Sequence, residues 1–141
     1  MRPLASADHG GGTIAVDLAG ITSVDAHEVT RIAWGDCLAA TWEPPLLTVT
    51  THIAGQSRRY AWQLPDPQRV PEVVHDRVSS VVIVDVRRDY GEHGVVRLVA
   101  RRTADGAEWL TLADDPTWAD SDVGRRSIAA DLAELQANLG V

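Results

Sequence analysis

Lysine and phenylalanine are absent from this sequence of 141 residues, and asparagine occurs once, as Asn138. Because the codons of these three residues are rich in A and T, the bias is typical of a GC-rich bacterial genome. Arginine therefore carries the permanent positive charge, and 5 tryptophans carry most of the aromatic bulk. We expect two or three tryptophans to lie in the core, where phenylalanine would otherwise pack.

Cysteine is scarce as well, since Cys37 is the only one. An internal disulfide is thereby excluded, which favours an intracellular protein, because secreted domains of this size often carry a disulfide framework. The N-terminus lacks a basic stretch followed by a long apolar one, and the longest apolar run is Val81–Val84. The sequence therefore predicts a cytoplasmic protein without a signal peptide and without integral membrane association.

Excess positive charge is also lacking. The formal net charge of −7 argues against a nucleic-acid partner, because such affinity comes largely from neutralising phosphates with basic side chains. With 45% hydrophobic and 23% charged residues, the composition is that of a globular chain. The length predicts one domain with one core over residues 13–141. Residues 1–12, which include three consecutive glycines, are predicted to form a flexible tail.

The first half of the sequence has a pattern typical of strands, followed by a short segment typical of a helix. Alternation and β-branched residues predict strands at 13–19, at 29–42 with a bulge or turn at Gly35–Asp36, at 46–52 and at 58–64. A helix is predicted at Pro71–Ser80, because proline suits the first helical position. Val74, Val78 and Val81 would form its buried stripe.

The second half predicts a three-stranded antiparallel meander at Val81–Tyr90, Val95–Thr103 and Glu108–Ala113. Asp105–Gly106 is a strong tight-turn signal between the last two strands. Both faces of this meander carry apolar residues. One face holds Val84, Val86, Val99, Leu110 and Leu112, and the other holds Ile83, Leu98 and Trp109. If Tyr90 pairs with Val95, Arg88 lies opposite Arg97, and like charges directly opposite one another are unfavourable.

An amphipathic helix is predicted at the C-terminus. Its apolar stripe consists of residues spaced by four, three and four positions: Ile128, Leu132, Leu135 and Leu139. An acidic or hydroxyl residue at 120–122 is predicted to cap the N-terminus of this helix, and Gly140 is predicted to end it. The predicted fold class is thus α+β, an antiparallel β-rich sandwich or partly open barrel with one internal short helix and a C-terminal amphipathic helix.

Four features that carry chemistry in other proteins are incomplete here. His9–Gly12 resembles the glycine-rich oxyanion loop of esterases, but the nearest candidate for a Gly-x-Ser-x-Gly elbow, residues 55–59, ends in arginine. Cys37 has no hydrolase signature around it, and we interpret it as a small core residue. The 5 histidines show no zinc-ligand spacing, and the aspartates at 114–122 lack the EF-hand pattern and are better explained by helix capping. No metal or cofactor is predicted.

The one concentration of positive charge lies on the meander and comprises five arginines: Arg87, Arg88, Arg97, Arg101 and Arg102. Acidic neighbours, Asp85, Asp89 and Glu108, would make it a mutually compensated surface. Alternatively, the arginines bind an anion such as a phosphate group or an acidic peptide, since guanidinium suits both. These five residues are the candidate ligand site that the sequence offers.

The order of several structural motifs supports a resemblance. They are Ile32-x-Trp34, Trp42 and Leu47-x-Val49, then Val74-x-x-Arg77-Val78-x-Ser80-Val81-Val82, then Gly94-Val95-Val96-Arg97-x-Val99-Ala100-Arg101-Arg102 and a closing helix with an acidic cap. From about Gly20 onward the chain resembles a group of short, uncharacterised proteins of high-GC, Gram-positive bacteria. These motifs are structural, so the resemblance assigns no functional residue.

The strand-rich body with a terminal helix is also similar to the pleckstrin-homology (PH) type of fold, in which a helix closes two orthogonal antiparallel sheets. The helix predicted at Pro71–Ser80 departs from the simplest version of that order. PH-like folds host lipid, peptide and protein binding alike.

The sequence thus predicts a non-enzymatic binding or regulatory module for a protein, a peptide or an anionic ligand. An exposed edge strand would recruit a partner chain, of which a homodimer is the simplest case. The alternative is a small hydrolase or isomerase whose acid–base residues meet only in three dimensions.

Overall fold

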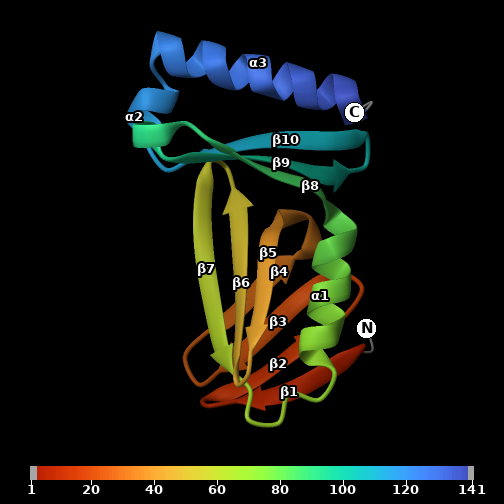
Figure 1. Ribbon diagram of the computed structural model, residues 1–141. Coiled ribbons are helices and arrows are strands. Elements are labelled where there is room, and N and C mark those ends of the chain that lie inside the picture. The colour runs from red at the N-terminus through yellow and green to blue at the C-terminus, as the bar shows by residue number, and fades with distance from the viewer. Residues whose placement is uncertain (1–2, 140–141) are drawn as a thin grey trace. The chain divides into compact units, whose positions relative to one another are not determined.

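The computed structural model describes residues 3–139 and is α+β, with antiparallel sheets (Figure 1). It divides into two compact units, residues 1–82 and 83–141, each with its own hydrophobic cluster. The sequence predicted one domain over 13–141. The division falls beside the junction of a helix and a strand, where the chain has no glycine-rich or proline-rich linker that would have signalled it.

The first unit begins with a four-stranded antiparallel sheet, whose strands follow in sequence order: β1 (Ala5–His9), β2 (Gly12–Val16), β3 (Gly20–Asp25) and β4 (Val29–Ala33). The prediction of a tail over residues 1–12 is therefore wrong from Ala5 onward, while residues 1 and 2 lie outside the described part. Only Gly10 and Gly11 form the loop between β1 and β2. Alternation of small and polar residues at 5–8 is the strand signal that the neighbouring glycines obscured.

The second sheet contains β5 (Cys37–Glu43), β6 (Leu46–Ile53) and β7 (Gln56–Gln63), in that order. A short 3₁₀ helix, Trp34–Asp36, leads from β4 into β5. The break predicted at Gly35–Asp36 is thus a change of sheet rather than a bulge within one strand. The segments predicted at 46–52 and 58–64 are confirmed as strands, with small shifts at their ends.

Helix α1 (Val70–Val81) follows β7 and confirms the predicted helix, with Pro71 in the first turn, where a missing N–H costs nothing. Its buried residues join those of both sheets in one core, which includes Ile14, Val16, Ile21, Ile32, Leu47, Val49, Trp62, Val70, Val74 and Val78. Trp34 and Trp62 are buried, as expected for two of the tryptophans. Cys37 is also buried, as a small core residue should be.

The second unit is built on the predicted meander, β8 (Val82–Asp89), β9 (Val95–Thr103) and β10 (Gly106–Ala113), with β9 in the middle. The predicted faces are wrong for β8, because Val84 and Val86 pack with Leu98 and Trp109. They are correct for β9 and β10, where Val99 lies opposite Leu110. The Tyr90 N–H bonds to the carbonyl of Gly94 instead of pairing with Val95. A shift of one residue moves a whole set of side chains to the opposite face.

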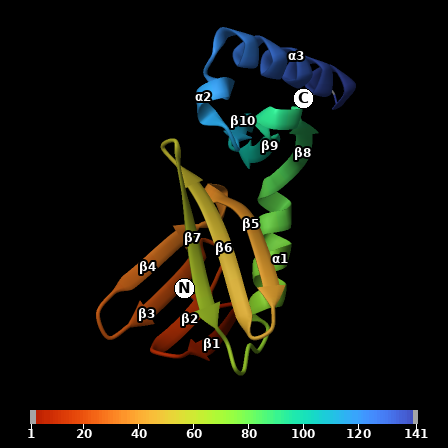
Figure 2. The ribbon, with the colours of Figure 1, turned by 60° about the vertical axis from the view of Figure 1, so that its left-hand side comes forward.

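Two helices complete the second unit (Figure 2), α2 (Pro116–Ala119) and α3 (Asp122–Leu139). Asp115 caps α2 by accepting the Trp118 N–H at 3.1 Å. The Ser121 hydroxyl accepts the Gly124 N–H at 3.1 Å, within the segment predicted to cap the last helix. Its buried stripe is shorter than predicted: Ile128 and Leu135 are buried and Leu139 is 49% exposed. Gly140, the predicted stop, lies outside the described residues.

Candidate functional site: a cleft along the edge strand β1

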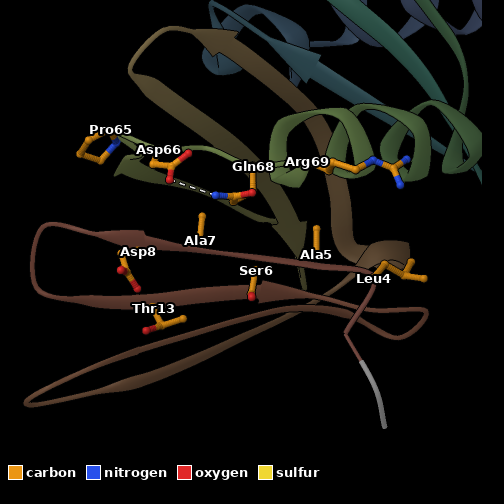
Figure 3. Close-up of a pocket in the computed structure, with 10 residues that line it drawn as sticks. All are labelled: Leu4, Ala5, Ser6, Ala7, Asp8, Thr13, Pro65, Asp66, Gln68 and Arg69. Atoms are coloured by element: carbon orange, nitrogen blue, oxygen red, sulfur yellow. Dashed lines mark hydrogen bonds between the residues drawn. The ribbon is translucent and has the colours of Figure 1, made fainter.

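A cleft of about 770 Å³ lies in the first unit between β1 and the segment that leads into α1 (Figure 3). Residues near the start of the chain line one side of this cleft, and residues of the turn before α1 line the other. The lining residues are Leu4, Ala5, Ser6, Ala7, Asp8, Thr13, Pro65, Asp66, Gln68 and Arg69. Four consecutive residues of the lining, 5–8, belong to β1, and Leu4 directly precedes them. The cleft therefore runs along a strand.

The strand that lines this cleft is the terminal one of its sheet, because β1 pairs with β2 and stands at the end of the strand order. The loop between β1 and β2 has two residues and is flanked by the pair His9–Gly12. In a hairpin with such a loop, the flanking residues are hydrogen-bonded to each other through their backbones. Because hydrogen-bonded pairs alternate with non-bonded ones along an antiparallel ladder, the backbone groups of Ala7 and Ala5 also bond to β2. The backbone N–H and C=O groups of Ser6 and Asp8 then point to the open edge.

The side chains alternate along the same stretch. Figure 3 shows Ala5 and Ala7 pointing toward the Pro65–Arg69 segment, and Ser6 and Asp8 pointing away from it. Ala7 is buried and Ala5 half-buried, so small side chains on this face leave room beneath the segment. The edge thus combines exposed backbone groups with a narrow apolar face and a polar face.

The opposite wall, Pro65–Arg69, contains one residue with an uncommon backbone conformation and two local hydrogen bonds. Gln68 has a φ of 54°, in the left-handed region that a glutamine adopts at a cost on the order of 1–3 kcal/mol. Its side-chain amide donates to Asp66 at 2.9 Å, and the Val70 N–H bonds to the Pro67 carbonyl at 3.1 Å. Residues in such sparsely populated conformations cluster at active sites, ligand clamps and switch regions.

The charge of the cleft is negative. Asp8 and Asp66 contribute two carboxylates. Arg69 is the one cationic lining residue, and it forms an ion pair with Glu72, whose carboxylate lies 3.3 Å from the Arg69 Nε. The lining therefore favours a ligand that carries positive charge.

A second cleft of about 500 Å³ lies on the other side of the same segment and shares Gln68 with the first. It is more apolar and involves β5, β6 and the first turns of α1: Ala40, Thr41, Trp42, Leu47, Pro67, Gln68, Pro71, Glu72 and His75. Trp42 is half-buried there, whereas Trp34 and Trp62 are buried in the core.

The predicted arginine site lies on the meander of the second unit, and two of its members are paired there. Arg97 binds Asp85 through two hydrogen bonds of 3.2 and 2.6 Å, and Arg101 reaches Glu108 at 3.4 Å. Asp85 and Glu108 are two of the three compensating acids that the sequence offered. These contacts favour charge compensation at Arg97 and at Arg101, whose side chain is buried.

The five arginines are also divided between the two faces of the meander. Successive residues of a strand point to opposite faces, so Arg87 is separated from Arg88 and Arg101 from Arg102. Arg88 lies near Tyr90, where its positive charge opposes the rise of the Tyr90 pKa. The structure does not bring all five arginines to one site.

Acid–base groups meet in pairs at several separate places. The His93 ring stacks on Trp118 with centroids 4.5 Å apart, and its Nδ1 lies 3.8 Å from the Asp115 carboxylate. His9 Nε2 lies 3.1 Å from the Ser23 hydroxyl. Within residues 3–139 no group of three His, Cys, Asp or Glu side chains is arranged to hold a metal ion. In that same range, no helix is long and apolar enough to cross a membrane.

Comparisons with known proteins add no assignment: no family model matches the chain, and neither the curated proteins nor the solved structures contain a significant match.

Proposed function

We propose that the first unit is a non-enzymatic peptide-binding module, which captures an extended basic segment of another protein along the open edge of β1. The observation that carries this proposal is that four consecutive residues of a terminal strand, 5–8, line one cleft. Addition of a strand at such an edge supplies affinity through main-chain hydrogen bonds, and side-chain pockets supply specificity.

The charges of the cleft define the partner segment. A strand added beside β1 places alternate side chains near Asp8 and the intervening ones near Asp66 and Gln68. Arginine or lysine at the positions facing Asp8 provides charge complementarity, and small residues at the intervening positions fit beneath the Pro65–Arg69 wall. The prepositioned wall lowers the entropic cost of binding.

The PH-like interpretation belongs to this proposal and applies to the first unit. Its support is the element order, in which a four-stranded antiparallel sheet, a three-stranded antiparallel sheet and one helix follow one another. In this interpretation α1 is the closing helix, where the sequence had assigned the role to the last helix of the chain.

The test is a titration of the full chain, labelled with ¹⁵N, with a seven-residue peptide that alternates arginine and valine. We expect the amide protons of Ser6 and Asp8 to move downfield and to exchange more slowly with solvent. A peptide that alternates glutamate and valine should leave them unchanged. Equal binding of both peptides, or shifts centred on the Trp42 indole instead of β1, would overturn the proposal.

Ser6→Pro is the matching variant. It removes an outward N–H that β2 does not use, and proline is tolerated on edge strands at such positions. Binding of the basic peptide should be lost while the thermal unfolding midpoint stays near that of the unaltered chain. Ser6→Thr keeps the N–H and is the control. A dimer of the unaltered chain in light scattering that Ser6→Pro dissolves would show that the edge serves self-association instead.

A further inference from the structure

The outer face of the second sheet carries a row of hydroxyl side chains around a hollow of about 210 Å³. In the register of this sheet, Thr41 lies opposite Thr48, and Thr50 lies opposite Arg59. Leu47 and Val49 alternate with these residues and point into the core. The hollow is therefore a feature of the sheet face itself, lined by Ala39, Ala40, Thr41, Thr48, Thr50, Ser57, Arg58 and Arg59.

Thr48 forms the floor of this hollow and is only 7% exposed. Among residues 3–139 its hydroxyl makes no hydrogen bond to a protein group. The hydroxyl oxygen itself is not enclosed, because it does not belong to the buried unpartnered atoms of the described residues, so water or a ligand can pair with it. The floor thus presents a hydroxyl group that is available to a ligand.

The charge of the hollow is positive in a chain of net charge −7. Arg59 shares the face of Thr50, and no carboxylate in the described part of the chain lies within 4.0 Å of its guanidinium. Arg58 points to the other face, where it lies over the Tyr60 ring at 5.4 Å from the centroid. The hollow has no acidic lining residue.

We infer that this hollow binds the phosphoryl group of a small phosphate monoester. A guanidinium offers paired N–H donors to phosphate oxygens, and the threonine hydroxyls at 41, 48 and 50 offer donors from the floor and sides. A volume of about 210 Å³ admits one phosphoryl group with a short organic part rather than a nucleotide. The site lies on a different sheet from β1 and does not depend on the peptide proposal.

The experiment is a titration of the full chain with inorganic phosphate and with glycerol 3-phosphate, with glycerol as the uncharged control. The two phosphates should shift the Arg59 Nε–H and the amides of Thr48 and Thr50. Arg59→Gln should weaken binding by about tenfold or more, because a charge-assisted contact is lost. Arg31→Gln, an exposed arginine on β4, should leave the affinity unchanged.

Thr48→Val keeps the shape of the side chain and removes the floor hydroxyl, so it should weaken phosphate binding while the spectrum of the folded protein is retained. Three results would overturn the inference: equal loss in Arg59→Gln and Arg31→Gln, an affinity that Thr48→Val leaves unchanged, or phosphate-induced shifts at Arg87, Arg88 or Arg102 with none at Arg59.

Discussion

The hydroxyl of Tyr90 donates a hydrogen bond to the carboxylate of Asp131, which joins the end of the β8 region to α3 within the second unit. The Tyr90 ring also packs against Trp118, with centroids 4.9 Å apart. Burial, followed by the bond to Asp131 and its negative charge, raises the pKa of Tyr90 from 10.0 to about 12. The protonated tyrosine is therefore the form that the folded unit favours.

This raised pKa predicts a loss of stability in alkali. The contribution of the neutral phenol is fully present below pH 10 and disappears as the pH rises from 10 through about 12. Urea unfolding should show a decrease over this interval that Tyr90→Phe lacks. The absorbance of tyrosinate at 295 nm should show a step near pH 12 in the unaltered chain that is missing in the variant. A step for Tyr90 at pH 10 would contradict the prediction.

Asp25 provides a prediction at the acidic end. Its Oδ1 accepts the backbone N–H groups of His27 and Glu28 at 2.8 and 2.9 Å, and these bonds lower the pKa of its carboxyl below 3.8. The effect of pH on stability is opposite to that of Tyr90. The stabilisation by the Asp25 carboxylate is present above pH 3.8 and is lost as the pH falls through the folded-state pKa. A ¹³C titration of the Asp25 carboxyl should give a midpoint below 3.8. A midpoint at or above that value would show that the turn is not formed in solution.

Ser23 and Trp62 connect the two sheets of the first unit through a buried hydrogen bond of 3.0 Å from the indole N–H to the hydroxyl. Ser23→Ala leaves that N–H without its acceptor and should lower the free energy of unfolding by about 1–3 kcal/mol. Chemical denaturation measures this change. A double-mutant cycle with Trp62→Phe should give a coupling energy of about 0.5 kcal/mol or more.

The control for this pair is His9→Ala, which removes the half-buried His9–Ser23 contact of 3.1 Å but keeps the indole bond. We expect it to cost less than Ser23→Ala. An equal or greater loss for His9→Ala would show that the bond to Trp62 is not the main interaction of Ser23.

The glycines of the first hairpin should differ sharply when replaced. A Cβ atom on Gly12 would lie 1.8 Å from the Val24 carbonyl oxygen of β3, whereas a Cβ on Gly11 would meet nothing within 4 Å. Gly12→Ala should therefore destabilise the chain by about 1–3 kcal/mol or more, since the backbone of two strands must separate. Gly11→Ala should change stability by less than about 0.5 kcal/mol. Thermal unfolding of both variants checks this, and equal stability would indicate that β2 does not pair with β3.

Local signals predicted a large part of the fold. Proline at position 71 with valines at 74 and 78 indicated α1, and the spacing of Ile128 and Leu135 indicated α3. Asp105–Gly106 located the last turn of the meander. Each of these depends on residues near one another in sequence, so the preference is present before the chain folds.

Sequence alone determined the α+β class, both long helices, the strand positions after Val29 and the packing role of Cys37. Only the tertiary structure decided that residues 5–9 form an edge strand, that β4 and β5 belong to different sheets, and that two cores form instead of one. It also paired Arg97 with Asp85 and placed Arg59 beside a threonine floor. These features depend on register and on contacts between distant segments, where a slip of one residue reverses every side chain, and the local sequence pattern does not encode that choice.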